Sequence, residues 1–172
     1  MKKLIILLLF IPLVSIGQEM SEFEKDPIAN AIEKASNYMM INGDHYGAIA
    51  EWTKLIELYP NCADCYNNRG LSKYQLKDYY GAIADYAKAI ELIPNAAFYT
   101  NRGASKRSLK DYYGAIADYT KAIELDPNYE NAYYNRAIAR YNLKDFNGAC
   151  EDARITGNLG ESFDEMIELT CK

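Results

Sequence analysis

The chain has 172 residues, with 24 acidic and 19 basic side chains and a formal net charge of −5 at pH 7. A net negative charge disfavours nucleic acid and anionic membrane surfaces as partners. The chain has a single histidine, His45, too few ligands for a typical zinc site and no acid–base pair for catalysis. It also lacks a Gly-rich phosphate loop. We therefore expect no enzyme, no bound metal or cofactor, and no nucleic-acid partner.

The first 17 residues have the pattern of a secretory signal peptide. Two lysines precede an apolar run over residues 4–14, and small residues follow it. A membrane-spanning helix needs roughly 20 apolar residues, whereas this run is shorter and contains Pro12. Without the two lysines, 17 basic residues face 24 acidic ones, and the net charge falls to −7. The pattern predicts an exported protein, periplasmic or secreted, that begins at Gln18 and does not insert into the membrane after cleavage.

A sixteen-residue block occurs twice, 33 residues apart. Residues 77–92 read KDYYGAIADYAKAIEL, and residues 110–125 differ only in that Thr120 replaces Ala87. Small and apolar residues at three- and four-residue spacing form one apolar stripe along each block, as in a helix. A second helical stretch precedes each block, and a polar break around KDY separates the two. The chain is therefore expected to be an array of helix–turn–helix units.

The recurring columns resemble the tetratricopeptide repeat (TPR) family. Its 34-residue unit has an aromatic and a small residue in helix A, an alanine and an aromatic in helix B, and a closing proline. The second unit has Tyr66, Gly70, Ala82, Tyr86, Ala89 and Pro94, and the third has Tyr99, Gly103, Ala115, Tyr119, Ala122 and Pro127. The first unit departs mildly, and the fourth has Ala153 in the aromatic column. The resemblance covers about residues 29–160. It implies an all-α fold, a right-handed α-solenoid of TPR helix-turn-helix repeats with a C-terminal capping helix.

The boundaries of the units divide the chain into four parts. We assign residues 1–17 to the signal peptide, 18–26 to a short leader, 27–160 to the TPR domain and 161–172 to the capping helix. The repeats within the TPR domain are about 27–61, 62–95, 96–128 and 129–160. The proposed cap has Phe163, Met166, Ile167 and Thr170 at helical spacing with acids between them, which predicts one apolar face over the last hairpin.

Four cysteines in an exported chain suggest disulfides. Cys150 lies in the last repeat helix and Cys171 in the proposed cap, and an antiparallel cap would bring the two together. Cys62 and Cys65 lie at the junction of the first two units. A structural disulfide, free thiols and redox or metal chemistry are all open for this second pair. We favour the disulfide, because a redox site of this spacing is expected in a βαβ context.

Two charged columns occur together in units two to four. One holds Arg69, Arg102 and Arg136, and the other holds Asp85, Asp118 and Asp152. The first unit has Ala35 and Glu51 at the equivalent places. Such columns are expected if arginine pairs with aspartate, either across the two helices of a unit or between neighbouring units. We interpret them as structural ion pairs rather than ligand contacts.

An asparagine precedes each of these arginines: Asn68, Asn101 and Asn135. In TPR arrays this position faces the concave groove, so the resemblance implies an asparagine ladder that holds an extended peptide backbone. The alternative is that asparagine simply tolerates an exposed helix face. Helix geometry adds neighbouring positions as groove candidates. They are Glu33, Asn37 and Met40 in unit one, Asn67, Leu71 and Tyr74 in unit two, Thr100, Ala104 and Arg107 in unit three, and Tyr134, Ile138 and Tyr141 in unit four.

The leading hypothesis is an exported, non-enzymatic protein–protein interaction module that binds a peptide or protein partner in the concave groove of its TPR array. The alternative is a structural or self-assembling scaffold component of a cell-envelope complex, in which the chain forms a homo-oligomer. We do not expect capture of a C-terminal carboxylate, because Glu33, Ala97 and Asn101 stand where chaperone-binding members of the family need lysine and arginine.

Overall fold

The computed structural model describes residues 32–34, 37–38, 43–156 and 171. In this part of the chain every regular element is a helix. In order, the helices are α3 (His45–Leu58), α4 (Ala63–Gln75), α5 (Tyr79–Leu92), α6 (Ala96–Ser108), α7 (Tyr112–Leu125), α8 (Glu130–Asn142) and α9 (Phe146–Ile155). Residues 32–34 and 37–38 are also helical. The predicted signal peptide and leader, and the predicted cap except for Cys171, lie outside the described residues.

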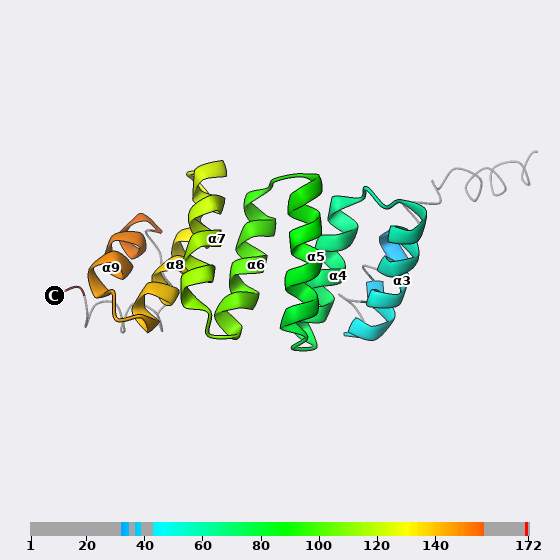
Figure 1. The fold of residues 1–172 in the computed structure, drawn as a ribbon, viewed down its shortest axis with the longest axis horizontal. Coiled ribbons are helices and arrows are strands. Elements are labelled where there is room, and N and C mark those ends of the chain that lie inside the picture. Colours follow the sequence, from blue (N-terminus) through cyan, green and yellow to red (C-terminus); the bar gives the residue numbers. More distant parts are fainter. Residues whose placement is uncertain (1–31, 35–36, 39–42, 157–170, 172) are drawn as a thin grey trace, which may run out of the picture.

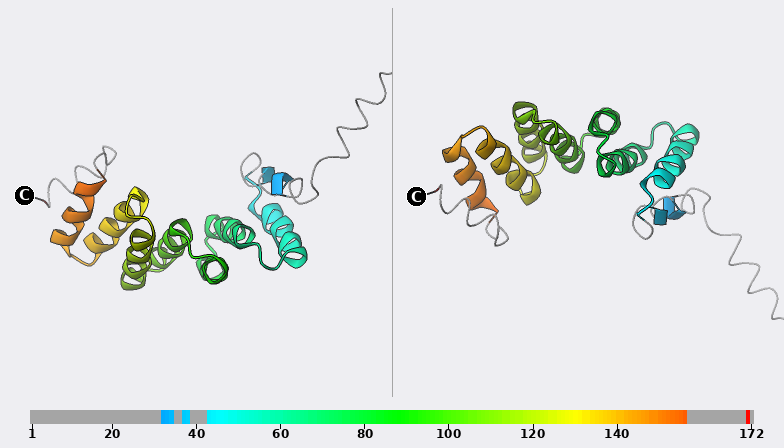
Figure 2. Two further views of the ribbon diagram at one scale, coloured as in Figure 1. Left: turned by 90° about the horizontal axis from the view of Figure 1, so that it is seen from above. Right: turned by 90° about the horizontal axis from the view of Figure 1, so that it is seen from below.

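The helices stand side by side in an elongated array (Figure 1). They form two layers, with α4, α6 and α8 in one and α3, α5, α7 and α9 in the other (Figure 2). We call these the inner and the outer layer, because the array bends with α4, α6 and α8 on its concave side. Each helix packs against the next one along the chain, and α6 also contacts α4 and α8. The predicted all-α solenoid of helix–turn–helix units is confirmed.

The KD dipeptide makes the tight turn inside the second, third and fourth units, and Gly43 and Asp44 stand in its place in the first. Lys77 adopts a left-handed backbone with φ of 63°, as do Lys110 and Lys144. Its N–H donates to the carbonyl of Tyr74, and the N–H of Asp78 donates to the carbonyl of Lys73, each at 2.9 Å, which is the Schellman pattern at a helix end. Asp78 then caps α5, accepting from the N–H of Gly81 at 3.0 Å. One dipeptide therefore ends helix A and starts helix B.

Close contact between a glycine and a tyrosine sets the distance between the two helices of a unit. A methyl group built at Gly70 would lie 2.8 Å from Cε1 of Tyr86, and one at Gly103 would lie 2.7 Å from Cε1 of Tyr119. The fourth unit has Ala137 where the second and third have glycine, and it has Ala153 in place of their tyrosine. The expectation that Gly70 lies where the helices approach closely is confirmed.

Gly103→Ala is expected to destabilise the protein by about 1–3 kcal/mol, because the added methyl group overlaps a tightly packed ring. The higher helix propensity of alanine offsets up to about 1 kcal/mol of this cost. The measurement is the free energy of unfolding in urea for Gly103→Ala, Tyr119→Leu and the double variant. The glycine substitution should cost less in the Tyr119→Leu background; an equal cost in both backgrounds would show that the ring contact is not the cause.

Both candidate cysteine pairs form disulfides in the structure. Cys62 is bonded to Cys65, with 5.3 Å between their Cα atoms, and Cys150 is bonded to Cys171, with 5.6 Å. Cys62 also caps α4, because its Sγ accepts the N–H of Cys65 at 3.2 Å. Of the three possibilities left open for this pair by the sequence, the structure has the disulfide. The other bond attaches residue 171 to α9.

Candidate functional site

Each of the last three units contains a buried arginine–aspartate pair that joins its two helices. In the second unit, Nε and Nη2 of Arg69 donate to the two carboxylate oxygens of Asp85 at 2.9 and 2.7 Å. The same two-pronged geometry joins Arg102 to Asp118 and Arg136 to Asp152. The bond to the aspartate is the main reason that the pKa of Arg69 is raised. These contacts confirm the structural ion pairs, and of the two arrangements that the sequence left open they are the one across the two helices of a unit.

A second cation, which the sequence analysis did not anticipate, shares each aspartate. Lys73 lies 2.8 Å from Asp85 and Lys106 lies 2.8 Å from Asp118. Arg140 takes this role in the fourth unit, 2.9 Å from Asp152. The signal is visible in the sequence, because each second cation follows the arginine by four residues and so shares its helix face. Each carboxylate is therefore surrounded by two positive charges.

Threonine hydroxyls connect two of these clusters to the preceding unit. Nη1 of Arg69 donates to Oγ1 of Thr53 at 3.2 Å, and Nη1 of Arg136 donates to Oγ1 of Thr120 at 3.0 Å. The third unit has no such bond, because Ala87 occupies the equivalent position. The single difference between the two sixteen-residue blocks thus decides whether the arginine of the next unit has an acceptor in the preceding unit.

The three predicted ladder asparagines all lie on the inner layer, on α4, α6 and α8. Nδ2 of Asn101 donates to Oδ1 of Asn67 on the neighbouring α4 at 2.9 Å. Nδ2 of Asn67 in turn lies 3.4 Å from Oδ1 of Asn68, and Asn135 donates to the carbonyl of Asn131 at 2.8 Å. The amides of units two and three therefore form one hydrogen-bonded row across the inner layer.

Several of the other groove candidates are engaged in packing. Tyr74 hydrogen-bonds Ser108 of the next unit at 3.3 Å. Tyr134 and Ile138 pack, together with Cys171, against the cluster of Ala137, Cys150 and Ala153. Thr100, another groove candidate, is buried. Tyr141 packs edge-on against Phe146. Of the remaining candidates that the structure describes, Glu33 and Asn37 are exposed, and Asn68, Leu71, Ala104 and Arg107 are half-buried.

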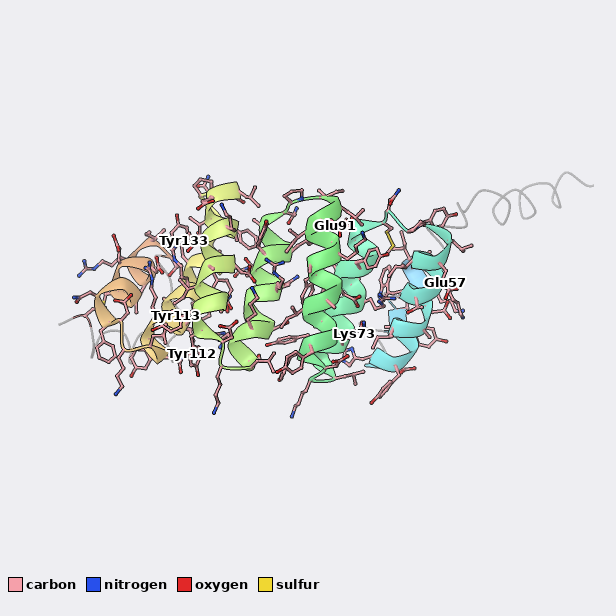
Figure 3. The ribbon with its side chains drawn as sticks, in the orientation of Figure 1. Glu57, Lys73, Glu91, Tyr112, Tyr113 and Tyr133 are labelled. Atoms are coloured by element: carbon pink, nitrogen blue, oxygen red, sulfur yellow. A yellow bond between two sulfur atoms is a disulfide. The ribbon has the colours of Figure 1, made fainter. Side chains whose placement is uncertain are left out.

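The two layers carry opposite charge. The inner helices α4, α6 and α8 contain seven basic and two acidic residues, whereas the outer helices α3, α5, α7 and α9 contain four basic and eight acidic residues. Figure 3 shows Lys73 of α4, and Glu57 and Glu91 near the ends of the outer helices α3 and α5. Three of the outer acids are the buried aspartates that pair with inner cations, and the inner helices still keep an excess of positive charge, a pattern that favours anionic partners on this side.

Surface hollows lie elsewhere, at the loops between units. One of about 460 Å³ is lined by Leu58, Tyr59, Pro60, Asn61, Cys62 and Cys65. Another of about 340 Å³ is lined by Pro94, Asn95, Ala96, Ala97, Leu125, Asp126 and Tyr129. The first is mostly apolar and lies beside the Cys62–Cys65 disulfide. In the described part of the chain, none of the helices has the length and apolar character required to span a membrane.

Solved structures of several proteins share this fold. A structure of MamA has a TM-score of 0.71 and 21% identity, and the match covers 81% of this chain and 81% of that one. The first TPR of Spaghetti (RPAP3), bound to the HSP90 peptide SRMEEVD, has a TM-score of 0.60 and 26% identity over 63% of this chain and 90% of that one. The Sgt2 TPR domain from Aspergillus fumigatus has a TM-score of 0.59 and 26% identity over 63% and 76% of the two chains.

Sequence comparison gives the same family. No curated protein sequence is significantly similar to this chain. Models of the tetratricopeptide repeat match residues 63–95, 96–129 and 118–151, and together these matches cover more than half of the chain. The fold and the relatives support a protein-interaction module. The chain belongs to the tetratricopeptide repeat family.

Proposed function

We propose that the protein is an exported, non-enzymatic TPR module that binds an extended segment of a protein partner along its concave face. The observation that carries this proposal is the row of amides across the inner layer. Asn67 and Asn101 are hydrogen-bonded between neighbouring units, Asn67 also bonds Asn68, and Asn135 lies at the equivalent position of α8, where it bonds the carbonyl of Asn131 in its own helix. An amide has both a donor and an acceptor, so the row matches the repeating N–H and C=O groups of an extended backbone.

A relative with bound peptide supports this use of the fold. The first TPR of Spaghetti (RPAP3) is bound to the peptide SRMEEVD of HSP90. The present chain has Glu33, Ala97 and Asn101 where a carboxylate clamp needs cations. We therefore extend to this chain only the binding of a peptide, and propose that its contacts run along the partner backbone rather than at the partner's C-terminus.

The sequence pattern of residues 1–17 and the two disulfides support export. Disulfides persist in oxidising compartments such as the periplasm and the extracellular space, and this chain contains two. We propose a periplasmic or secreted location on these grounds.

The test is affinity capture with residues 18–172 from the envelope and secreted fractions of the source cell. Asn68, Asn101 and Asn135 changed together to alanine should abolish capture of the partner, because the row loses its donors and acceptors. A peptide from the captured partner should then bind the unaltered chain and not this variant. The matched control changes three exposed asparagines away from the concave face, Asn61, Asn128 and Asn147, to alanine. Equal capture by both triple variants would refute the amide row as the binding surface.

A second candidate, a self-assembling scaffold, is favoured by the exposed rings on the outer helices. Tyr46, Tyr80 and Tyr113 recur at the same position of α3, α5 and α7, and Tyr113 is 77% exposed; Figure 3 shows it at the start of α7. Tyrosine is common in protein interfaces. Under this reading, light scattering would show a concentration-dependent oligomer that persists in the asparagine variant and is lost when the three tyrosines are changed to serine.

A further inference from the structure

Arg107 differs from the other cations of the inner helices. Those cations are Arg69, Lys73, Arg102, Lys106, Arg136 and Arg140, and each of them lies within ion-pair distance of a buried aspartate. Arg107 lies on the same layer, on α6, and is half-buried. Within the described residues no carboxylate pairs with it, and its Nε is buried without a hydrogen-bond partner. Burial of a guanidinium without a counter-charge is unfavourable, so binding of an anion beside Arg107 would be favourable.

The surroundings of Arg107 add a second unpaired polar group. The hydroxyl of Tyr119 is buried and has no hydrogen-bond partner, in a side chain that is 0% exposed. Burial raises the pKa of Tyr119 to about 12, although the facing guanidinium of Arg107 acts in the opposite direction. The two groups are therefore close, yet their geometry does not meet that of a hydrogen bond. The Tyr74–Ser108 hydrogen bond, between the neighbouring helix α4 and the end of α6, adds two more hydroxyls nearby.

The electrostatic surroundings have the sign that an anion requires. Helix α6 contains Arg102, Lys106 and Arg107 and no acidic residue. Arg102 and Lys106 share the single negative charge of Asp118 across the helix pair, so two positive charges remain in excess. A carboxylate that approaches α6 therefore meets a positive local field in a protein whose overall charge is negative.

We propose that Arg107 binds the side-chain carboxylate of an aspartate or glutamate in the extended partner segment, so that the module prefers acidic segments. The planar guanidinium suits a two-pronged bond to a carboxylate. This inference rests on the proposed function and specifies the chemistry of the partner. The carboxylate belongs to a side chain within the segment, because Arg107 lies on the middle helix of the inner layer, with Asn68 on α4 and Asn135 on α8 to either side.

Selection from a library of displayed peptides tests the inference. The probe is a phage library of random peptides of about 12 residues, which reach about 40 Å when extended, with their C-termini joined to the coat protein so that no free C-terminal carboxylate is present. Selection on residues 18–172 should enrich peptides that contain Asp or Glu at one recurrent position. Selection on Arg107→Gln should still yield peptides, without that enrichment. Arg154→Gln, which removes an exposed arginine on the outer helix α9, should retain it.

A binding measurement with a synthetic copy of the best peptide, amidated at its C-terminus, isolates the contact. Replacing its acidic residue by the corresponding amide should weaken binding to the unaltered protein by about tenfold or more, because charge-assisted hydrogen bonds are strong. The affinities of Arg107→Gln for the acidic and the amide peptide should agree within about twofold. Arg107→Lys keeps the charge but not the planar fork. Its preference for the acidic peptide over the amide peptide should lie between those of the unaltered protein and Arg107→Gln. Circular dichroism and urea unfolding of each variant verify that it is folded.

The outcomes separate the two proposals. If no peptide is selected by the unaltered protein, the proposed function fails, and this inference fails with it. If peptides are selected without acidic residues, or if Arg107→Gln retains the acidic preference, the inference fails while binding along the amide row stands. Both proposals are supported if the variant with Asn68, Asn101 and Asn135 changed to alanine selects no peptides and Arg107→Gln loses only the acidic preference.

Discussion

Asp118→Asn is expected to lower the free energy of unfolding by about 3–5 kcal/mol, because it leaves two partly buried cations without their counter-charge. Asp118 is 3% exposed. Its carboxylate accepts from Arg102 at 3.0 and 2.7 Å and lies 2.8 Å from Nζ of Lys106. Domains of this size are stable by about 5–15 kcal/mol in total. The substitution therefore removes a large part of the stability of the array.

Urea unfolding followed by circular dichroism measures this effect. The matched control is Glu124→Gln, which makes the same change of charge on the same helix α7 at a side chain that is 55% exposed. Glu124→Gln should change the free energy of unfolding by no more than about 0.5 kcal/mol, as for most surface substitutions. Two results would contradict a large contribution of the buried Asp118 charge to stability. One is a similar loss of stability in the two variants, and the other is unfolding of Asp118→Asn at the same urea concentration as the unaltered protein.

Removing the Cys150–Cys171 disulfide is expected to destabilise the C-terminal end of the array by about 3 kcal/mol. This bond closes a loop with a sequence separation of 21, whereas Cys62 and Cys65 are separated by only 3. In the chain-entropy account, the longer loop gains more from cross-linking. Cys171 also packs beside Tyr134 and Ile138, so its release exposes apolar surface of the fourth unit.

Amide hydrogen exchange on Cys150→Ala/Cys171→Ala, which leaves no unpaired thiol, measures this loss. Contacts in a repeat array are mainly between neighbours, so protection should fall in α8 and α9 and persist in α5 and α6. The Cys62→Ala/Cys65→Ala variant is the control for the loss of two cysteines. Uniform loss of protection along the whole array would contradict a local role for the C-terminal bond.

The sequence predicted the features that depend on spacing along the chain. The apolar stripes predicted the helices, and the joint occurrence of Arg69 and Asp85 in the repeat predicted their pairing, which the structure contains. The contact between Gly70 and Tyr86 was also within reach, because a residue without a side chain recurs opposite a large ring. All of these contacts lie inside one helix–turn–helix unit, whose internal geometry is fixed by its short turn.

Contacts between units were harder to predict. Asn101 bonds Asn67 of the neighbouring unit rather than Asn68, its counterpart in the repeat, because this choice depends on the offset between successive inner helices. The left-handed conformation of Lys77 was also missed, since glycine and asparagine are the usual residues there. For the partner-binding role of the inner face, the structure gives the positions of the side chains, and the role itself stays a prediction.

The excess of basic residues on the inner helices and of acidic residues on the outer helices adds a component across the array to the electric dipole moment of the molecule. In the electric field of an approaching acidic chain, such a molecule turns its α4–α6–α8 side toward that chain before contact. At physiological salt the screening length is about 8 Å, a little less than the diameter of one helix. The torque therefore acts only over the last helix width of the approach, where it raises the fraction of collisions that arrive in the correct orientation.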